Sequence, residues 1–215
     1  MKRILQSAIL LVILIACGEV KQKYELPIIG RSEVVERDVD GKTIYDTVYH
    51  TIDDFRFVNQ DSAIVTNATF EDKVYVTDFF FTSCPTICPI MKQQMLRIHE
   101  AYKDNPQVAL LSHTIDPKYD TVALLKDFSE KLGVSSDKWH FVTGDQDKIY
   151  DIGEKSYLSV MAEEEGAPGG YIHSGAIILV DKERRIRSVM DGTVPEQVDV
   201  MIADIQRLLD EYDAK

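Results

Sequence analysis

One run of residues, 73–81, consists almost entirely of apolar, aromatic and β-branched residues (KVYVTDFFF), and it constrains the fold more than any other part of the chain. A strand of this composition is buried on both faces, so we expect it at the centre of a sheet that is covered on each side. Cys84 and Cys88 follow it directly, and apolar residues then recur at helical spacing as far as Lys103. The sequence therefore predicts a strand-to-helix corner that carries two thiols.

Further strands and helices alternate after this corner. We expect strands at 108–114, 139–143, 175–180 and 186–190, and helices at 120–132, 145–157 and after Thr193-Val194-Pro195-Glu196. The last of these segments has the pattern of a capping box. Before the corner, two alternating segments flank Asp40-Gly41, which is a strong β-hairpin signal.

This order of elements predicts an α/β fold, a mixed sheet flanked by helices, with an N-terminal β-hairpin extension. A central strand that ends in a cysteine corner, together with a β-β-α finish, is similar to the thioredoxin fold over about residues 73–212.

The N-terminus carries a third cysteine, Cys17, in a targeting pattern. Lys2 and Arg3 precede a short apolar run, which ends in Leu14-Ile15-Ala16-Cys17. The pattern resembles a bacterial lipoprotein signal, in which residues 1–16 are removed and Cys17 is lipidated. The alternative is an uncleaved anchor helix, although the apolar run is short for a membrane span.

Both alternatives place the chain in the bacterial cell envelope, held at a membrane and facing the periplasm, where disulfides persist. We expect residues 17–27 to form a tether and residues 28–215 a single domain. The formal net charge is −12, and no stretch of the sequence clusters Lys and Arg. This charge argues against a nucleic-acid partner.

Cys84 and Cys88 are four residues apart, so on a helical turn both sulfurs lie on the same side. A helix N-terminus stabilises thiolates, and we therefore expect both sulfurs to be accessible and reactive. A purely structural disulfide would close too short a loop to contribute much stability. The pair either exchanges electrons as a disulfide or holds a thiophilic metal.

The presence of His173 favours metal binding over disulfide exchange. A redox protein of the thioredoxin type has two residues between its cysteines, whereas this chain has three. The position that holds a cis-proline in such proteins is Gly175 here, and His173 lies two residues before it. Two thiolates and an imidazole form a three-coordinate site that holds copper in both oxidation states. Zinc with an additional water is the alternative that this ligand set leaves open.

Several motifs together resemble the Sco (SenC/PrrC) family. They are CPTICP after a strand ending in Phe81-Thr82-Ser83, then Asp116-Pro117 with Asp120-Thr121, Trp139 in the third strand, and the distal His173. The resemblance implies a thioredoxin-like fold with one copper ion, Cu(I) or Cu(II), bound by Cys84, Cys88 and His173. It also implies a role in assembling the dinuclear copper site of cytochrome c oxidase subunit II, with an upstream copper donor or thiol reductant as a further partner.

The leading interpretation is a membrane-tethered copper chaperone without enzymatic activity. The alternative is a thiol-disulfide oxidoreductase that uses Cys84 and Cys88 as a redox-active pair, disulfide-bonded when oxidised, on cysteines of the oxidase subunit or other exported proteins. A thiol peroxidase is disfavoured because it would not need Cys88 and His173 together.

Other candidate ligands are better explained by packing. We expect this of six residues: His50, His99, His113, His140, Met91 and Met95. Asp78 lies inside the central strand, where a buried carboxylate requires a partner. It either supports the metal ligands or serves as a hydrogen-bonded structural group.

Overall fold

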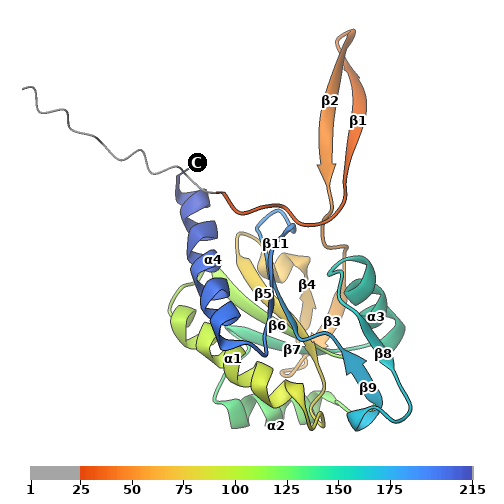
Figure 1. Ribbon diagram of the computed structural model, residues 1–215, viewed down its shortest axis with the longest axis vertical. Helices are drawn as coiled ribbons and strands as arrows, with labels where there is room; N and C mark the ends of the chain where they lie inside the picture. The colour runs from red at the N-terminus through yellow and green to blue at the C-terminus, as the bar shows by residue number, and fades with distance from the viewer. Residues whose placement is uncertain (1–24, 215) are drawn as a thin grey trace, which may run out of the picture.

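The computed structural model describes residues 25–214, in which a seven-stranded mixed sheet has helices on both faces (Figure 1). The strand order is β11-β10-β5-β6-β7-β3-β4, and β5, β6 and β7 are parallel. The strands are β3 (Arg56–Asn59), β4 (Ile64–Thr66), β5 (Val74–Phe80), β6 (Val108–Thr114), β7 (Trp139–Thr143), β10 (Ala176–Val180) and β11 (Ile186–Asp191). The α-helices are α1 (Ile87–Tyr102), α2 (Val122–Leu132), α3 (Gln146–Lys155) and α4 (Pro195–Asp213). The predicted α/β architecture is confirmed.

β5 is buried along its whole length, as its composition predicts. Phe80 packs against Phe128 of α2, with ring centroids 5.5 Å apart, and lies under Lys92 of α1. Phe79 packs on the other face against Tyr157, with ring centroids 5.7 Å apart. The sheet therefore separates two apolar layers, with α1, α2 and α4 on one side and α3 on the other (Figure 1).

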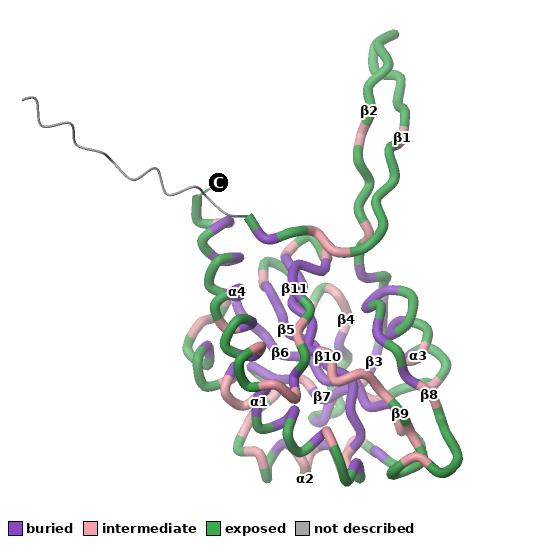
Figure 2. The backbone as a smooth tube through the Cα atoms, viewed as in Figure 1, coloured by how far each residue is buried: buried purple, intermediate pink, exposed green. Residues whose placement is uncertain are grey.

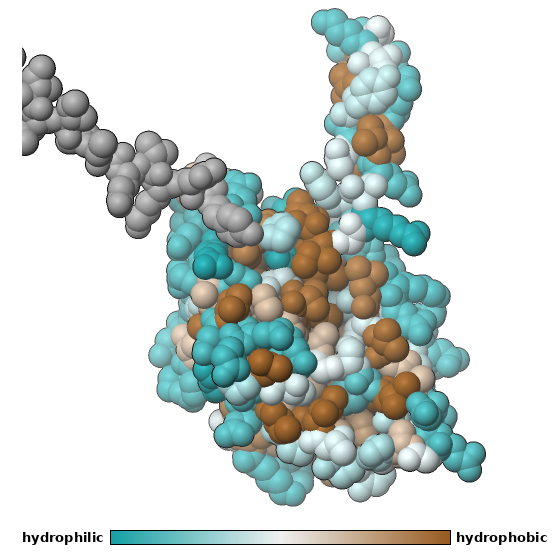
Figure 3. Space-filling model, viewed as in Figure 1, coloured by the Kyte–Doolittle hydropathy of each residue, from teal (hydrophilic) through white to brown (hydrophobic). Residues whose placement is uncertain are grey.

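A β-hairpin formed by β1 (Ser32–Val39) and β2 (Lys42–Tyr49) projects from this body (Figure 1). Asp40 and Gly41 both have positive φ, 52° and 76°, as a two-residue hairpin turn requires. The hairpin is exposed along most of its length and carries apolar side chains (Figures 2 and 3). The predicted N-terminal extension is thus confirmed as a separate two-stranded sheet.

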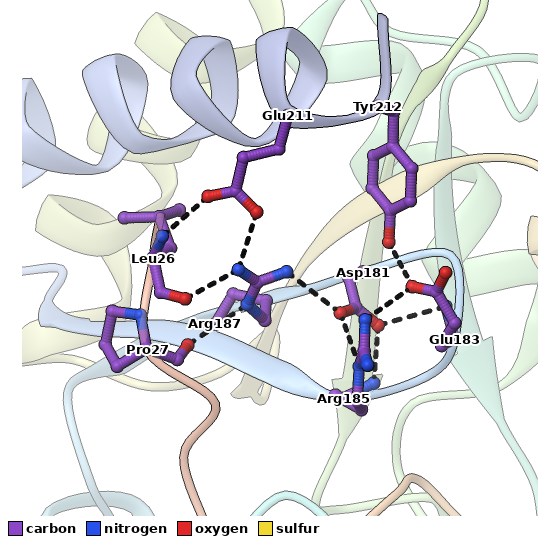
Figure 4. Close-up of polar contacts among 8 residues, drawn as sticks. All are labelled: Leu26, Pro27, Asp181, Glu183, Arg185, Arg187, Glu211 and Tyr212. Atoms are coloured by element: carbon purple, nitrogen blue, oxygen red, sulfur yellow. Dashed lines mark hydrogen bonds and ion pairs between the residues drawn. The ribbon is translucent and has the colours of Figure 1, made fainter. Parts of the chain in front are cut away.

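The chain enters the domain through a buried polar network (Figure 4). Arg187 of β11 donates to the carbonyl oxygens of Leu26 and Pro27 and pairs with Glu211 of α4 at 2.7 Å. Arg187 also pairs with Asp181 at 3.2 Å, and Glu211 accepts the Leu26 N–H at 2.6 Å. Leu26 and Pro27, expected at the end of the tether, therefore pack on the domain.

The start of α4 differs from the expected capping box. The hydroxyl and the N–H of Thr193 both donate to the Asp191 carboxylate, because the chain turns tightly at Gly192. Val194 consequently precedes the helix without a side-chain cap, and Pro195 is the first helical residue.

The expected signal peptide and Cys17 lie outside the described residues. Within residues 25–214, no helix combines the length and the apolar character that a membrane crossing requires.

The buried network predicts a strong effect of Arg187. We expect Arg187→Ala to lower the free energy of unfolding by about 3–5 kcal/mol, because Glu211 would keep a buried charge without its cationic partner. The Leu26 and Pro27 carbonyls would also lose their donor, whereas Asp181 would keep its pair with Arg185. Arg184→Ala, which breaks the exposed pair with Asp54, should change stability little. Urea unfolding of both variants measures the difference, and equal losses would contradict the importance of the network.

Candidate metal centre

Cys84 and Cys88 lie at the corner where β5 ends and α1 begins. Cys88 belongs to the first turn of α1. Cys84 precedes the helix in a tight turn, in which its N–H donates a hydrogen bond of 3.3 Å to the Phe81 carbonyl oxygen. Both are free thiols, but their exposed fractions are only 8% and 4%. The expectation that both sulfurs are accessible is therefore wrong.

The corner is covered by a second small sheet, formed by β8 (Met161–Glu163) and β9 (Tyr171–His173). The connection between β8 and β9 lies directly against Phe81. A Cβ added to Gly169, which has a φ of 79°, would be 2.6 Å from the Phe81 ring. Tyr171 packs on the same ring, with centroids 5.2 Å apart. The β8–β9 hairpin thus covers one side of the corner.

His173 ends β9 and points at the cysteines. His173 was expected between the predicted strands, whereas in the structure it pairs with Met161 of β8. Its Nε2 is 3.2 Å from Cys88 Sγ, and its Nδ1 is 3.0 Å from the Ser174 carbonyl oxygen. Nδ1–H donates to that carbonyl, so Nε2 directs its lone pair toward the thiol.

The ligand atoms of Cys84, Cys88 and His173 all lie within 4.8 Å of one another. Among residues 25–214, this is the one cluster of His, Cys and carboxylate groups with the spacing of a metal site. Two sulfurs and one imidazole nitrogen are soft and borderline ligands, which suit copper and zinc rather than calcium or magnesium. The structure therefore brings together the three residues that the sequence selected.

The two thiols differ in acidity. Burial opposes ionisation of Cys84, but hydrogen bonds from the Cys88 thiol and from backbone N–H groups outweigh it and lower the pKa of Cys84. Burial raises the pKa of Cys88, and the neighbouring Cys84 raises it further. Burial also lowers the pKa of His173, which keeps the imidazole neutral. Cys84 is thus the first thiol to ionise.

Asp78 is a hydrogen-bonded structural group beneath this corner. Its carboxylate pairs with Lys92 at 2.6 Å and accepts a hydrogen bond from Ser112. Lys92 lies one turn after Cys88 and is itself almost completely buried. Lys92 was not predicted from the sequence, although a usable signal was present. Lys92 lies in the apolar stripe of α1, and this helix packs on the strand that carries Asp78.

Asp120 holds the other side of the corner. Its carboxylate accepts the Thr82 N–H at 3.1 Å and the hydroxyls of Thr82 and Thr114. Burial raises the pKa of Asp120, and these hydrogen bonds oppose the rise. In the sequence Asp120 stands out only as part of a motif, whereas in the structure it anchors Thr82, two positions before Cys84.

The remaining candidates serve packing, as expected. Met91 and Met95 are completely buried, and His113 stacks on Phe79 with centroids 4.9 Å apart. Three more histidines make other contacts: His50 with the Ser156 carbonyl, His140 with Asn59, and His99 with the Trp139 ring. Within the described part of the chain, none of them joins the Cys84 cluster.

Comparisons with known proteins point to one family. A family model described as SCO1/SenC matches residues 45–210. The SCO1 protein homolog of Bacillus subtilis is 30% identical over 168 residues, which are 77% of this chain and 86% of that protein.

Solved structures agree. A SCO1/SenC family lipoprotein from Bacillus anthracis has a TM-score of 0.69 and 27% identity, covering 74% of this chain and 95% of its own. BsSco, described as a member of the Sco family of cytochrome c oxidase assembly proteins with a disulfide switch, has a TM-score of 0.65 and 28% identity, covering 74% and 93%. ScoI of Bradyrhizobium japonicum, solved with copper bound, is 22% identical and shares the fold, with a TM-score of 0.61 and coverage of 74% and 99%.

The burial of His113 predicts a loss of stability in acid. Burial lowers the pKa of His113 to about 3, whereas an unfolded histidine titrates near about 6.5. The unfolded chain therefore binds the extra proton between these values, and stability falls as the pH drops through this range. Urea unfolding between pH 7 and pH 4 should show a smaller loss for His113→Phe than for the wild type. Parallel pH profiles would contradict this assignment.

Proposed function

The chain belongs to the SCO1/SenC family, and we propose that it is a membrane-tethered copper chaperone that carries one copper ion on Cys84, Cys88 and His173. The observation that carries the proposal is the convergence of these three ligands at one buried corner. The proposed acceptor is the dinuclear copper site of cytochrome c oxidase subunit II. The description of BsSco as belonging to a family of cytochrome c oxidase assembly proteins supports this choice.

The site binds its cargo through two thiolates and a neutral imidazole. Cys84 ionises first, and Cys88 gives up its proton as the metal binds, so loading releases protons. The hydrogen bond from Nδ1 to the Ser174 carbonyl keeps Nε2 of His173 ready to bind the metal. Oxidation of the cysteine pair to a disulfide removes both thiolates and prevents loading. An upstream copper donor or thiol reductant must therefore act before delivery.

The proposed anchor is a lipid on Cys17, which would hold the domain in the bacterial cell envelope, facing the periplasm. Support comes from the sequence pattern around Cys17 and from the relative in Bacillus anthracis that is described as a lipoprotein.

A second candidate function is thiol-disulfide exchange on the acceptor's cysteines. The unequal acidity of the two thiols favours it, because Cys84 can attack a disulfide as a thiolate and Cys88 can then resolve the mixed disulfide. A disulfide switch was identified in BsSco, and this also supports the candidate.

Replacing each ligand tests copper binding. The reduced protein should retain one copper per chain through a desalting column, and Cys84→Ser or Cys88→Ser should abolish this retention. His173→Ala should weaken copper(II) binding far more than it changes the thiol redox potential. Metal analysis and copper absorption spectroscopy provide the measurement, with His140→Gln as a histidine control outside the site. Absence of copper from the reduced wild type would contradict the chaperone function.

A second experiment separates the two functions. The reduced, copper-free protein is mixed with an oxidised soluble domain of oxidase subunit II, and free thiols on that domain are counted. A chaperone without reductase activity leaves this disulfide intact, but transfers copper to the pre-reduced domain. Reduction of the disulfide together with failure to transfer copper would establish the oxidoreductase instead.

A further inference from the structure

A groove of about 330 Å³ runs between α1 and α2 and has both cysteines in its wall. Its apolar sides come from both helices and from the corner itself: Phe81, Leu96, Phe128 and Leu132. Leu96, Phe128 and Leu132 are half-buried, so their apolar surfaces are within reach of a ligand. His173 is not part of this wall, because it approaches the cysteines from β9.

The groove presents no free charge, although the protein has a net charge of −12. Lys92 is the one charged residue of the wall, and its ammonium is paired with Asp78, buried, and in contact with the Phe80 ring. The exposed polar lining is limited to groups such as Gln93 and Thr82. A charged segment would lose hydration here without gaining a partner, whereas a neutral apolar segment would gain by burial.

The cysteines restrict how a recipient can reach the metal. Their exposed fractions are 8% and 4%, and the β8–β9 hairpin covers the corner through Gly169 and Tyr171. A recipient ligand must come into direct contact with the metal, so it needs a path to the sulfurs that hold it. The groove provides an approach to the cysteines that the hairpin does not cover.

We propose that the α1–α2 groove receives the segment of the acceptor that carries its copper-binding thiols, and that this segment is neutral and apolar beside those thiols. The inference rests on the proposed chaperone function, whose recipient it specifies. Transfer is a ligand exchange that leaves copper as copper(I). Each incoming thiol passes its proton to the departing Cys84 or Cys88 thiolate, so no oxidant or reductant is consumed.

Two synthetic peptides test the preference. Both carry the same pair of cysteines and the same net charge, but one has Leu and Phe beside the cysteines and the other has Ser and Gln. The copper(I)-loaded protein should deliver copper to the apolar peptide about ten times faster, because one apolar side chain is buried during the exchange. Equal rates would overturn the proposal.

Substitutions on each helix locate the effect. Leu96→Gln and Leu132→Gln should each remove most of the preference for the apolar peptide without changing the copper content. Val200→Gln is the matched control, because Val200 is an exposed apolar residue of α4, away from the groove. Circular dichroism checks the folding of each variant, and two separate positions keep the test valid if one of them misfolds. A preference that survives both groove substitutions would contradict the proposal.

A copper-free measurement separates the groove from the chaperone function. The reduced protein is treated with the neutral aromatic reagent 4,4′-dithiodipyridine or with neutral hydroxyethyl disulfide. A cysteine thiolate forms a mixed disulfide with either reagent and releases the other half as a thiol or thione. Leu96→Gln and Leu132→Gln should slow the aromatic reaction severalfold and leave the hydroxyethyl reaction unchanged. Unchanged rates with both reagents would overturn the groove proposal, whereas a protein that fails only to bind copper would overturn the chaperone function.

Discussion

β5 is buried on both faces, with Phe79 packed into one apolar layer and Phe80 into the other. A shift of this strand by one residue would exchange its two faces, and both layers would lose their packing. The end of β5 is therefore fixed in space, and with it the corner that carries Cys84 and Cys88. The position of the metal centre depends on this constraint, because two of its ligands follow the strand directly.

Two buried polar clusters hold the elements on either side of the corner. Lys92 joins α1 to β5 and β6 through Asp78 and Ser112, and Asp120 joins the loop at Thr82 to Thr114. Buried charges of this kind contribute little net stability, because their desolvation offsets much of the attraction. These clusters instead fix positions, because they hold the turn that carries the cysteines against the sheet. The thiols themselves take no part in either cluster.

The N-terminal segment at Leu26 and Pro27 packs on the domain near the opposite end of β5 from the metal centre. β10 runs antiparallel to β5 and pairs Val180 with Tyr75, which places Asp181 and the Arg187 network beside the start of β5 (Figure 4). The metal centre lies at the end of the same strand. Leu26 and the metal ligands are thus separated by the length of the sheet.

The sequence by itself determined the type and order of the main elements, although not β8 and β9, because the apolar run of β5, the helical periodicity after Cys88 and the Asp40-Gly41 turn are local signals. It also selected the three metal ligands: the cysteines through their spacing, and His173 through its place beside the expected cis-proline position and the resemblance of the surrounding motifs. Only the tertiary structure decided that the sulfurs are buried and unequal in acidity, that β8 and β9 pair over the corner, and that Asp78 pairs with Lys92. Burial of the corner depends on the β8–β9 hairpin, which lies far from the cysteines in the chain, and the acidity of each sulfur depends on the desolvation and hydrogen bonds that result from folding. Neither property has a local pattern in the sequence.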